Sequence, residues 1–229
     1  MEKLRQAALA GDPEAQNEMG CYYCQEGEKH QNYMEAVKWF RMAADAGFFM
    51  AQYNLGYSYE MGNGVFQDYK QAVEWYLKAV ESDSDYEAAL YRLFRCYYNG
   101  LGVEQDMKKA ADYCLMAAKQ YHTPSQYYMG KLYEKGEGVT QDLNEAFRWI
   151  EKAAEDDYRD AQIALSKYYL SGEGPVEENL DLAREWYDKA VANSDEEPQR
   201  EEIISKPIQR TTPSKLEQRI KEMRESMKK

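Results

Sequence analysis

One pattern of about 36 residues occurs five times between Asp12 and Ala192, and this repetition limits the folds available to the 229-residue chain. The second copy shows it most clearly, with Ala51, Leu55 and Tyr59 spaced i, i+4, i+8, followed by the turn Gly62-Asn63-Gly64-Val65. The same residue types return 36 residues earlier, 38 residues later and twice more at intervals of 36. Because periods of about 20–50 residues are typical of repeat architectures, the sequence predicts an array of small units.

Each copy predicts two helices joined by a turn. In the first helix, the spacing above places apolar side chains on one face, and the glycine turn tolerates the left-handed backbone of a helix end. The second helix follows a polar capping residue. The predicted caps are Asn32, Asp68, Asp106, Asp142 and Asn179. Three residues after a cap, Glu35, Gln71 and Glu145 predict capping boxes. One helix pair cannot bury its apolar face, whereas stacked pairs can, so the copies predict an α-solenoid.

Within a copy the motifs follow the order Ala-x-x-x-Leu-Gly-x-x-Tyr, Gly-x-Gly-Val, Gln-Asp, Ala-x-x-Trp and Lys-Ala-Ala. This order resembles that of Sel1-like repeats, which are relatives of tetratricopeptide repeats. The resemblance covers about 180 of the 229 residues. It implies an all-α fold, a right-handed α-α superhelix (solenoid) of five helix-turn-helix repeats with terminal capping helices. It also implies an adaptor or scaffold that binds other proteins and has no catalytic activity of its own.

The predicted domain organisation follows the copies. Residues 1–11 form an N-terminal half-repeat cap, because Ala7-Ala8-x-x-Gly11 matches Ala43-Ala44-x-x-Gly47. The five repeats are placed at about 12–47, 48–84, 85–121, 122–157 and 158–192. A linker is expected at 193–213 and a basic amphipathic C-terminal helix at 214–229.

Two copies depart from the pattern. In the first copy, Glu26-Gly27-Glu28 stands in place of the Gly-x-Gly turn. In the third copy, Phe94 stands at the position of Gly56, and Leu90 at the position of Gln52. A bulky side chain in place of a packing glycine predicts looser or rotated packing between the second and third copies, with local opening near Phe94.

The C-terminal segment differs in charge from the rest of the chain. From Ser205 onward it has 8 basic and 3 acidic residues, a net charge of +5, whereas the whole chain has a formal net charge of −12. An apolar stripe at i, i+4, i+7, i+11 predicts an amphipathic helix: Leu216, Ile220, Met223 and Met227. This helix either caps the last repeat, or docks in the groove of its own or a neighbouring copy and competes with a ligand.

The overall composition disfavours several classes of partner and location. With 41 acidic and 29 basic residues, the chain is a poor match for the phosphate backbone of nucleic acids. The sequence has no run of about 18 apolar residues, and its first residues lack the apolar core of a secretory signal. Four cysteines without a signal predict free thiols in a reducing compartment, so we expect a cytoplasmic protein without nucleic-acid or membrane partners.

Catalytic and metal-binding patterns are weak. Cys21 and Cys24 form one C-x-x-C pair, but a zinc site needs further ligands and a redox fold needs a βαβ context. Their redox or metal role stays open. His30 and His122 lie in predicted loops, where we expect solvated side chains. We therefore predict no enzyme, cofactor or metal; the enzymatic alternative is a hydrolase with a Cys/His site, for which Cys24 and His30 are the pair to inspect.

Resemblance to tetratricopeptide repeats implies that one face of each first helix lines a concave partner-binding groove. The candidate residues on it are Asn17, Tyr53, Tyr57, Glu60, Tyr91, Arg95, Tyr98, Tyr127, Lys131, Glu134 and Lys167. They include a basic column, Arg95, Lys131 and Lys167, beside a tyrosine column. Cations beside aromatic faces suit a peptide that carries carboxylates, such as a free C-terminus, with an apolar anchor. In the alternative interpretation, the three cations pair with glutamates on adjacent helices.

These observations predict a non-catalytic adaptor or scaffold that binds a protein or peptide in the groove. One variant is a neutralising, immunity-type partner that blocks a basic protein with its acidic convex surface. Charge supports this variant but does not identify the partner.

Overall fold

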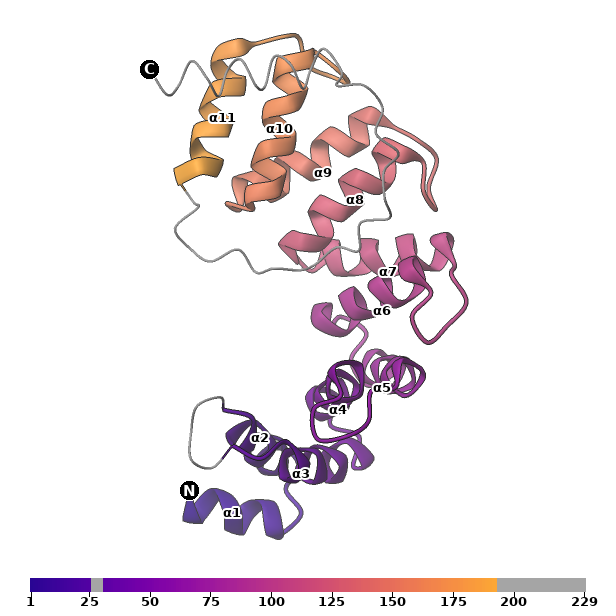
Figure 1. The fold of residues 1–229 in the computed structure, drawn as a ribbon, viewed down its shortest axis with the longest axis vertical. Coiled ribbons are helices and arrows are strands. Elements are labelled where there is room, and N and C mark those ends of the chain that lie inside the picture. Colours follow the sequence, from indigo (N-terminus) through magenta and orange to yellow (C-terminus); the bar gives the residue numbers. More distant parts are fainter. Residues whose placement is uncertain (26–30, 193–229) are drawn as a thin grey trace. The chain divides into compact units, whose positions relative to one another are not determined.

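A computed structural model describes residues 1–25 and 31–192, which contain eleven α-helices and no strand (Figure 1). The helices are α1 (Glu2–Leu9), α2 (Pro13–Cys24), α3 (Tyr33–Asp45), α4 (Phe49–Met61), α5 (Tyr69–Ser82), α6 (Glu87–Asn99), α7 (Met107–Lys119), α8 (Thr123–Lys135), α9 (Leu143–Glu155), α10 (Arg159–Ser171) and α11 (Leu180–Ala192). The all-α class predicted from the sequence is confirmed. The predicted linker, the C-terminal helix and the turn at 26–28 lie outside the described residues.

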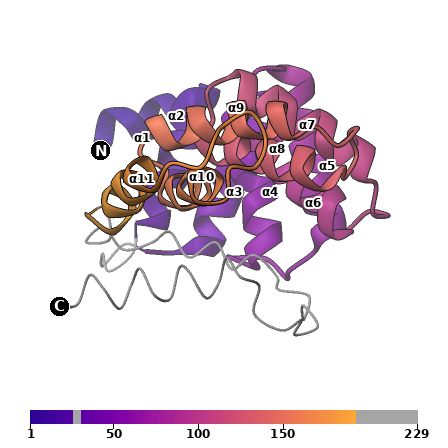
Figure 2. The same cartoon turned by 90° about the horizontal axis from the view of Figure 1, so that it is seen from above.

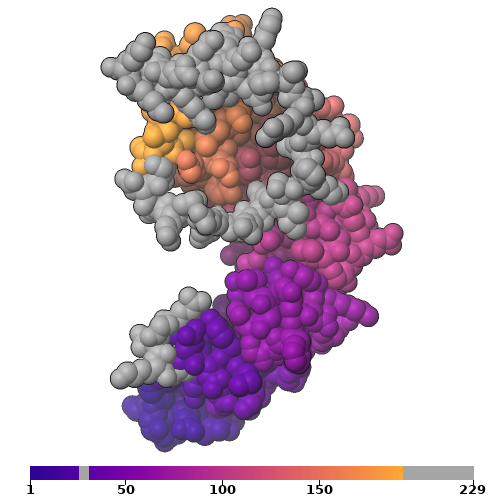
Figure 3. All heavy atoms as spheres, in the orientation of Figure 1, coloured from indigo at the N-terminus to yellow at the C-terminus, as the bar shows by residue number. Residues whose placement is uncertain are grey.

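The chain divides into two compact units, residues 1–141 and 142–229, and each is described by itself. In the first unit, α2 packs against α3, α4 against α5, and α6 against α7, while α1 packs on α2. In the second unit, α10 packs against both α9 and α11. Figure 2 shows the same helices from above, and in Figure 3 the atoms of the first unit run in sequence order from indigo to pink.

Each predicted cap begins a second helix. The Asp68 carboxylate accepts hydrogen bonds from the backbone N–H groups of Lys70 and Gln71, at 2.9 and 3.1 Å, and thereby satisfies two amides that lack a partner within the helix. The side chains of the other four caps, Asn32, Asp106, Asp142 and Asn179, accept equivalent bonds. The predicted helix starts are therefore confirmed.

The backbone amide of the cap has a different partner from the one that a capping box predicts. The N–H of Asp68 donates to the carbonyl of Tyr59 at 2.9 Å, and the N–H of Asp106 donates to the carbonyl of Tyr97 at 3.0 Å. The glutamine before the cap closes the same loop, since Gln67 Nε2 donates to the carbonyl of Glu60 at 2.8 Å. The Gln-Asp motif thus ties the start of the second helix to the end of the first.

The glycine turn has two separate functions. Gly62 ends α4 in the left-handed conformation, with φ +74°, which satisfies the helix end without a Cβ clash. Gly64 packs the loop on the preceding repeat, because a Cβ there would collide with the carbonyl of Tyr33. Gly102 and Gly138 lie in the same way against Tyr69 and Met107. The second glycine therefore joins one repeat to the previous one.

Within a repeat, a glycine allows the two helices to approach closely. A Cβ on Gly56 would lie 2.8 Å from the ring of Tyr76, and the ring of Phe40 occupies the equivalent space beside Gly20. In the third repeat, Phe94 replaces this glycine, and the fully buried Cys114 stands at the position of Tyr76. In the third repeat the large side chain is therefore on the first helix and the small one on the second helix, the reverse of Gly56 and Tyr76, and Phe94 is buried. The predicted local opening near Phe94 concerns motion and stays a prediction.

The N-terminal helix α1 contacts α2 in the same way that the second helix of a repeat contacts the following repeat. Its Ala8 is fully buried, and Gln16 Nε2 donates to the Ala8 carbonyl at 3.1 Å. Gln52 Nε2 donates to the carbonyl of Ala44 in the same way, at 3.3 Å. Residues 1–11 thus contact α2 as a second helix contacts the next repeat. Within the described ranges, each helix is too short or too polar to span a membrane.

The exchange of large and small partners makes a testable prediction in the first repeat. Gly20→Phe should destabilise the chain by about 3 kcal/mol, because the space beside Gly20 already holds the Phe40 ring. Adding Phe40→Cys should recover about half of that loss, as in the Phe94 and Cys114 combination. Urea unfolding of the two single variants and the double variant measures the coupling, and additive losses would contradict this explanation.

Candidate partner-binding face

In the first unit, side chains of α2, α4, α6 and α8 contact one another from repeat to repeat. Asn54 Nδ2 on α4 donates to Asn17 Oδ1 on α2 at 2.9 Å. Arg92 on α6 reaches Glu60 on α4, and Tyr128 on α8 lies against Phe94 on α6, with ring centroids 5.3 Å apart. These helices therefore share one continuous surface, which we call the first-helix face.

A buried charged cluster lies at the junction of the second and third repeats. Glu60 is 6% exposed, and its carboxylate accepts two hydrogen bonds, from the Tyr76 hydroxyl at 2.6 Å and from Arg92 Nη1 at 3.3 Å. The guanidinium carbon of Arg92 also lies 4.9 Å from the centre of the Tyr57 ring. Because an unpaired buried carboxylate would be costly, the hydroxyl and the guanidinium are what allow Glu60 to lie there.

The cluster shifts the pKa values of its members. Burial raises the pKa of Tyr76 well above its ordinary value, and the neighbouring Glu60 carboxylate raises it further. For Arg92, burial lowers the pKa, but Glu60 and the hydroxyls of Tyr53 and Tyr76 outweigh it and raise the pKa overall. Tyr76 thus stays protonated as a donor, and Arg92 stays charged throughout the physiological pH range.

Tyrosines cover this cluster on the α4 side. The ring of Tyr53 stacks on that of Tyr57, with an interplanar angle of 13° and centroids 6.4 Å apart. Tyr53 also contacts Tyr86 edge-on at 5.4 Å. Both Tyr53 and Tyr57 are half-buried, so each side chain keeps part of its surface accessible. Such rings lose little conformational entropy when they bind a partner.

On α6 and α8 the face is also aromatic. The Tyr98 hydroxyl donates to Glu137 Oε2 at 2.8 Å. Burial, together with that hydrogen bond, raises the pKa of Tyr98 to about 12. Tyr91 is 4% exposed and lies against the rings of His122 and Tyr128. The half-buried Tyr127 meets Tyr128 edge-on at 5.5 Å.

The three basic residues predicted from the sequence differ in their partners. Lys131 pairs with Glu134, one turn further along its own helix. Arg95 is half-buried, and Lys167, on α10 of the second unit, is exposed; within residues 1–25 and 31–192 neither forms an ion pair. The alternative interpretation, in which Arg95, Lys131 and Lys167 pair with glutamates on adjacent helices, was wrong. Among the three, Lys131 alone has an ion pair within the described residues, and its partner Glu134 lies on the same helix.

The predicted residues thus divide by exposure. Asn17, Glu60 and Tyr91 are buried and position their neighbours. Those that remain accessible are Tyr53, Tyr57, Arg95, Tyr98, Tyr127, Lys131, Glu134 and Lys167. Sequence reasoning missed Asn54, Arg92 and Tyr128, which occupy equivalent positions one residue after the tyrosine column. The sequence does show a polar or aromatic residue at each of these positions, which could have indicated contacts between neighbouring first helices.

The described residues offer little catalytic chemistry. They contain no group of three histidine, cysteine or acidic side chains placed to hold a metal ion. Burial and the neighbouring Cys21 raise the pKa of Cys24 to about 11, so the nucleophilic thiolate is scarce at neutral pH. His30 lies outside the described residues, so the Cys24–His30 hypothesis stays untested.

His122 differs from the expected solvated loop residue. It is half-buried, its Nδ1 lies 2.8 Å from Ser125 Oγ, and its ring centroid lies 4.7 Å from that of Tyr91. It is also the N-cap of α8, because the backbone N–H of Ser125 donates to its Nδ1 at 3.3 Å. The expectation of a solvated side chain was wrong because the imidazole contacts Tyr91 of α6 and Ser125 of α8.

Comparison with known proteins gives a family and a fold. The profile of the Sel1 repeat matches residues 13–48, 49–84, 87–122, 123–158 and 159–195. Among the curated proteins, none matches significantly.

Solved structures of Sel1 repeat proteins are similar to this chain. A protective antigen of uropathogenic Escherichia coli with an SLR fold has 38% identity and a TM-score of 0.79, covering 84% of this chain and 40% of its own. A Sel1 repeat protein from Oxalobacter formigenes has 31% identity and a TM-score of 0.73, covering 80% and 72%. This chain thus spans less than half the length of the first of these proteins. The predicted all-α superhelix of Sel1-like repeats is confirmed.

The buried cluster makes a prediction about stability. Glu60→Ala should destabilise the chain by about 3 kcal/mol, because Arg92 and the Tyr76 hydroxyl lose their partner while they remain largely buried. The double variant Glu60→Leu with Arg92→Leu should lose less, since no buried charge is left unpaired. Urea unfolding compares the two variants; equal losses would show that packing, and not charge, stabilises this junction.

The thiol pKa makes a prediction about reactivity. In the full-length chain, alkylation of Cys24 should be slow at pH 7, where about one thiol in ten thousand is ionised, and should increase up to about pH 11. Mass spectrometry of the alkylated peptide, with Cys24→Ser as the blank, gives the profile. An apparent pKa below 8 would instead indicate an activated nucleophile and revive the hydrolase alternative.

Proposed function

This chain belongs to the Sel1 repeat family, and we propose that it is a non-catalytic scaffold whose first-helix face binds a protein or peptide partner. Sel1 repeat proteins generally mediate protein–protein interaction, and their fold is typically a non-catalytic module. The partner, its chemistry and the residues that bind it are the proposed part. The Escherichia coli antigen is more than twice as long as the part of it that this chain matches. Any activity of a whole protein is therefore also part of the proposal.

The observation that carries this proposal is a half-exposed aromatic surface on a rigid base. Tyr53, Tyr57 and Tyr127 are half-buried. The Glu60–Arg92 pair contacts Tyr57, and further rings pack against Tyr53 and Tyr127. Aromatic and arginine side chains contribute most of the energy at protein interfaces. A surface held in place before binding also loses less entropy on association.

Arg95 indicates the chemistry of the partner. Within the described ranges its guanidinium has no ion pair, whereas Lys131, at the equivalent position of the next repeat, pairs with Glu134. A guanidinium binds a carboxylate through two parallel hydrogen bonds, which fixes the direction of the ligand. We infer a peptide that carries a carboxylate, either a free C-terminus or an acidic side chain, with an apolar residue that packs among the tyrosines.

The immunity-type variant and the hydrolase alternative have weaker support than the scaffold proposal. The immunity-type variant rests on the net charge of −12, which is a property of the whole chain and selects no surface. The hydrolase alternative requires a nucleophile, and the raised pKa of Cys24 disfavours one. The four cysteines are free, which supports a reducing compartment, and we propose a cytoplasmic location on that basis.

A peptide selection tests the proposal. The full-length chain is used to select from displayed peptide libraries with free and with blocked C-termini. We expect the selected peptides to share a carboxylate and a large apolar residue. Arg95→Glu together with Lys131→Glu should weaken their binding at least tenfold, because both cations on the face become anions.

The matched control for that variant is Arg148→Glu with Lys152→Glu, two exposed cations on α9 that lie outside the first-helix face. Both double variants should melt close to the parent, since Arg148 and Lys152 are exposed, Arg95 has no ion pair within the described residues, and a partly exposed pair such as Lys131–Glu134 contributes little stability. Retention of native affinity by the Arg95 and Lys131 variant would show that the peptide binds elsewhere.

A further inference from the structure

The turn between α7 and α8 contains a tyrosine in a backbone conformation that residues other than glycine seldom adopt. Tyr121 has φ +60°, in the left-handed region, where the Cβ of a residue crowds the following carbonyl oxygen. Its side chain is nevertheless 82% exposed. Within residues 1–25 and 31–192, that side chain forms no hydrogen bond, ion pair or ring contact. The turn is therefore strained for a ring that the described fold hardly contacts.

Other turns of the array show that this position does not need a tyrosine. Four turns have a left-handed residue directly before the N-cap of a first helix: Gly11, Gly47, Tyr121 and Asp157. The backbone bonds are equivalent, since the N–H of Gly47 donates to the carbonyl of Ala44 at 3.0 Å, and that of Tyr121 donates to the carbonyl of Ala118 at 3.2 Å. Because glycine adopts this conformation without a Cβ clash, glycine would form the turn at least as well.

The aspartate at the equivalent turn has a structural role that Tyr121 lacks. Asp157 Oδ1 accepts a hydrogen bond from Gln162 Nε2 at 3.1 Å, and aspartate tolerates the left-handed region better than most residues. Strained residues of this kind are concentrated at functional sites, where binding compensates for the strain. The ring of Tyr121 is thus available to a partner.

The position of Tyr121 connects it with the first-helix face. The next residue along the chain, His122, contacts the ring of Tyr91 on α6, with centroids 4.7 Å apart. Tyr91 in turn lies against Tyr128 on α8, at 6.1 Å. The aromatic contacts of the face therefore reach the residue next to Tyr121, and the turn borders the face at the N-terminal end of α8.

We propose that the peptide bound on the first-helix face extends over the α7–α8 turn and packs an apolar side chain against the ring of Tyr121. This inference rests on the proposed function and adds a contact residue to it. A tyrosine ring offers a large contact area at a small entropy cost, and tyrosines are common among the residues that dominate binding. Such a contact explains why a strained tyrosine stands where glycine would suffice for the fold.

Replacing the ring tests this inference, because the fold and the partner require different residues at this position. Tyr121→Gly in the full-length chain should melt no lower than the parent, since the relief of left-handed strain offsets the greater freedom of glycine in the unfolded chain. It should nevertheless bind the selected peptides roughly fivefold more weakly or worse. Tyr121→Phe keeps the ring and should retain the parent affinity. Thermal melting and calorimetric titration measure the two quantities.

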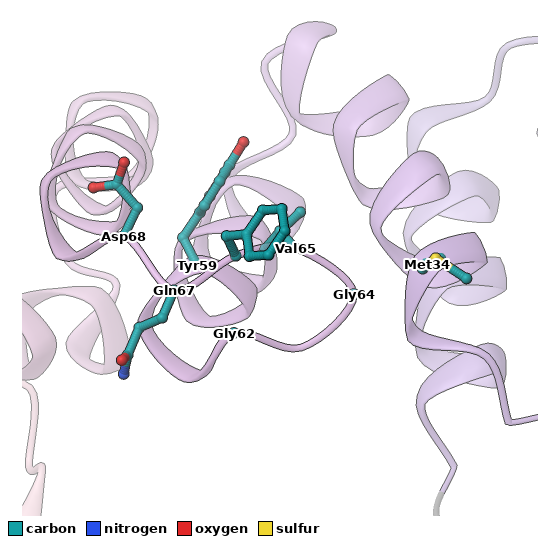
Figure 4. A pocket seen from close by; sticks show the side chains of 8 residues that line it. Met34, Tyr59, Gly62, Gly64, Val65, Gln67 and Asp68 are labelled. Carbon is teal, nitrogen blue, oxygen red and sulfur yellow. The ribbon is translucent and has the colours of Figure 1, made fainter.

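The matched control is another exposed aromatic residue. Phe66 is 97% exposed, in the loop between α4 and α5, and lines an open pocket with Met34 and Tyr59 (Figure 4). None of the residues proposed for the first-helix face lines that pocket. Phe66→Thr introduces the residue type of the equivalent position, Thr140, so we expect it to fold and to leave the peptide affinity unchanged.

The outcomes separate this inference from the proposed function. Native affinity of Tyr121→Gly for peptides that the Arg95→Glu and Lys131→Glu variant no longer binds would overturn the inference and leave the proposed function intact. A melting temperature of Tyr121→Gly well below that of the parent would also overturn it, because the ring would then stabilise the fold. If no selected peptide depends on Arg95 and Lys131, the proposed function fails, and the inference fails with it.

Discussion

The close approach of two helices at a glycine is the contact on which the remainder of the second repeat depends. Because Gly56 has no side chain, the ring of Tyr76 can lie against α4. From that position the Tyr76 hydroxyl reaches Glu60, and Glu60 in turn binds Arg92 of the next repeat. The packing within one repeat thereby determines the contact between repeats.

This arrangement separates the residues that build the array from those that face outward. Backbone carbonyls, the Gln-Asp motif and the paired glycines form the joints, and they recur with little change. Positions on the first helices are then free to vary, from Asn17 to Tyr53 to Tyr91 in one column. A repeat array can change its ligand without changing its joints, because each repeat contacts mainly its neighbours.

The sequence predicted whatever depends on local spacing. The asparagine and aspartate caps, the left-handed glycines and the helix pairs were all visible within a window of about 36 residues, and they are present. Contacts between repeats were harder to predict. The partner of Glu60 lies 32 residues away, and the imidazole of His122 is buried by a tyrosine 31 residues earlier. A single sequence gives little information on such distances, so Arg92 was missed and His122 was misplaced in solvent.

The central claim is that a partner binds across the first helices of successive repeats. Hydrogen exchange of the full-length chain, with and without a selected peptide, measures this most directly, because bound segments exchange more slowly. The account predicts added protection in α4 and α6, around Tyr57 and Arg95, with little change in α5 and α7. Protection confined to the second helices, or to the loops between helices, would contradict it.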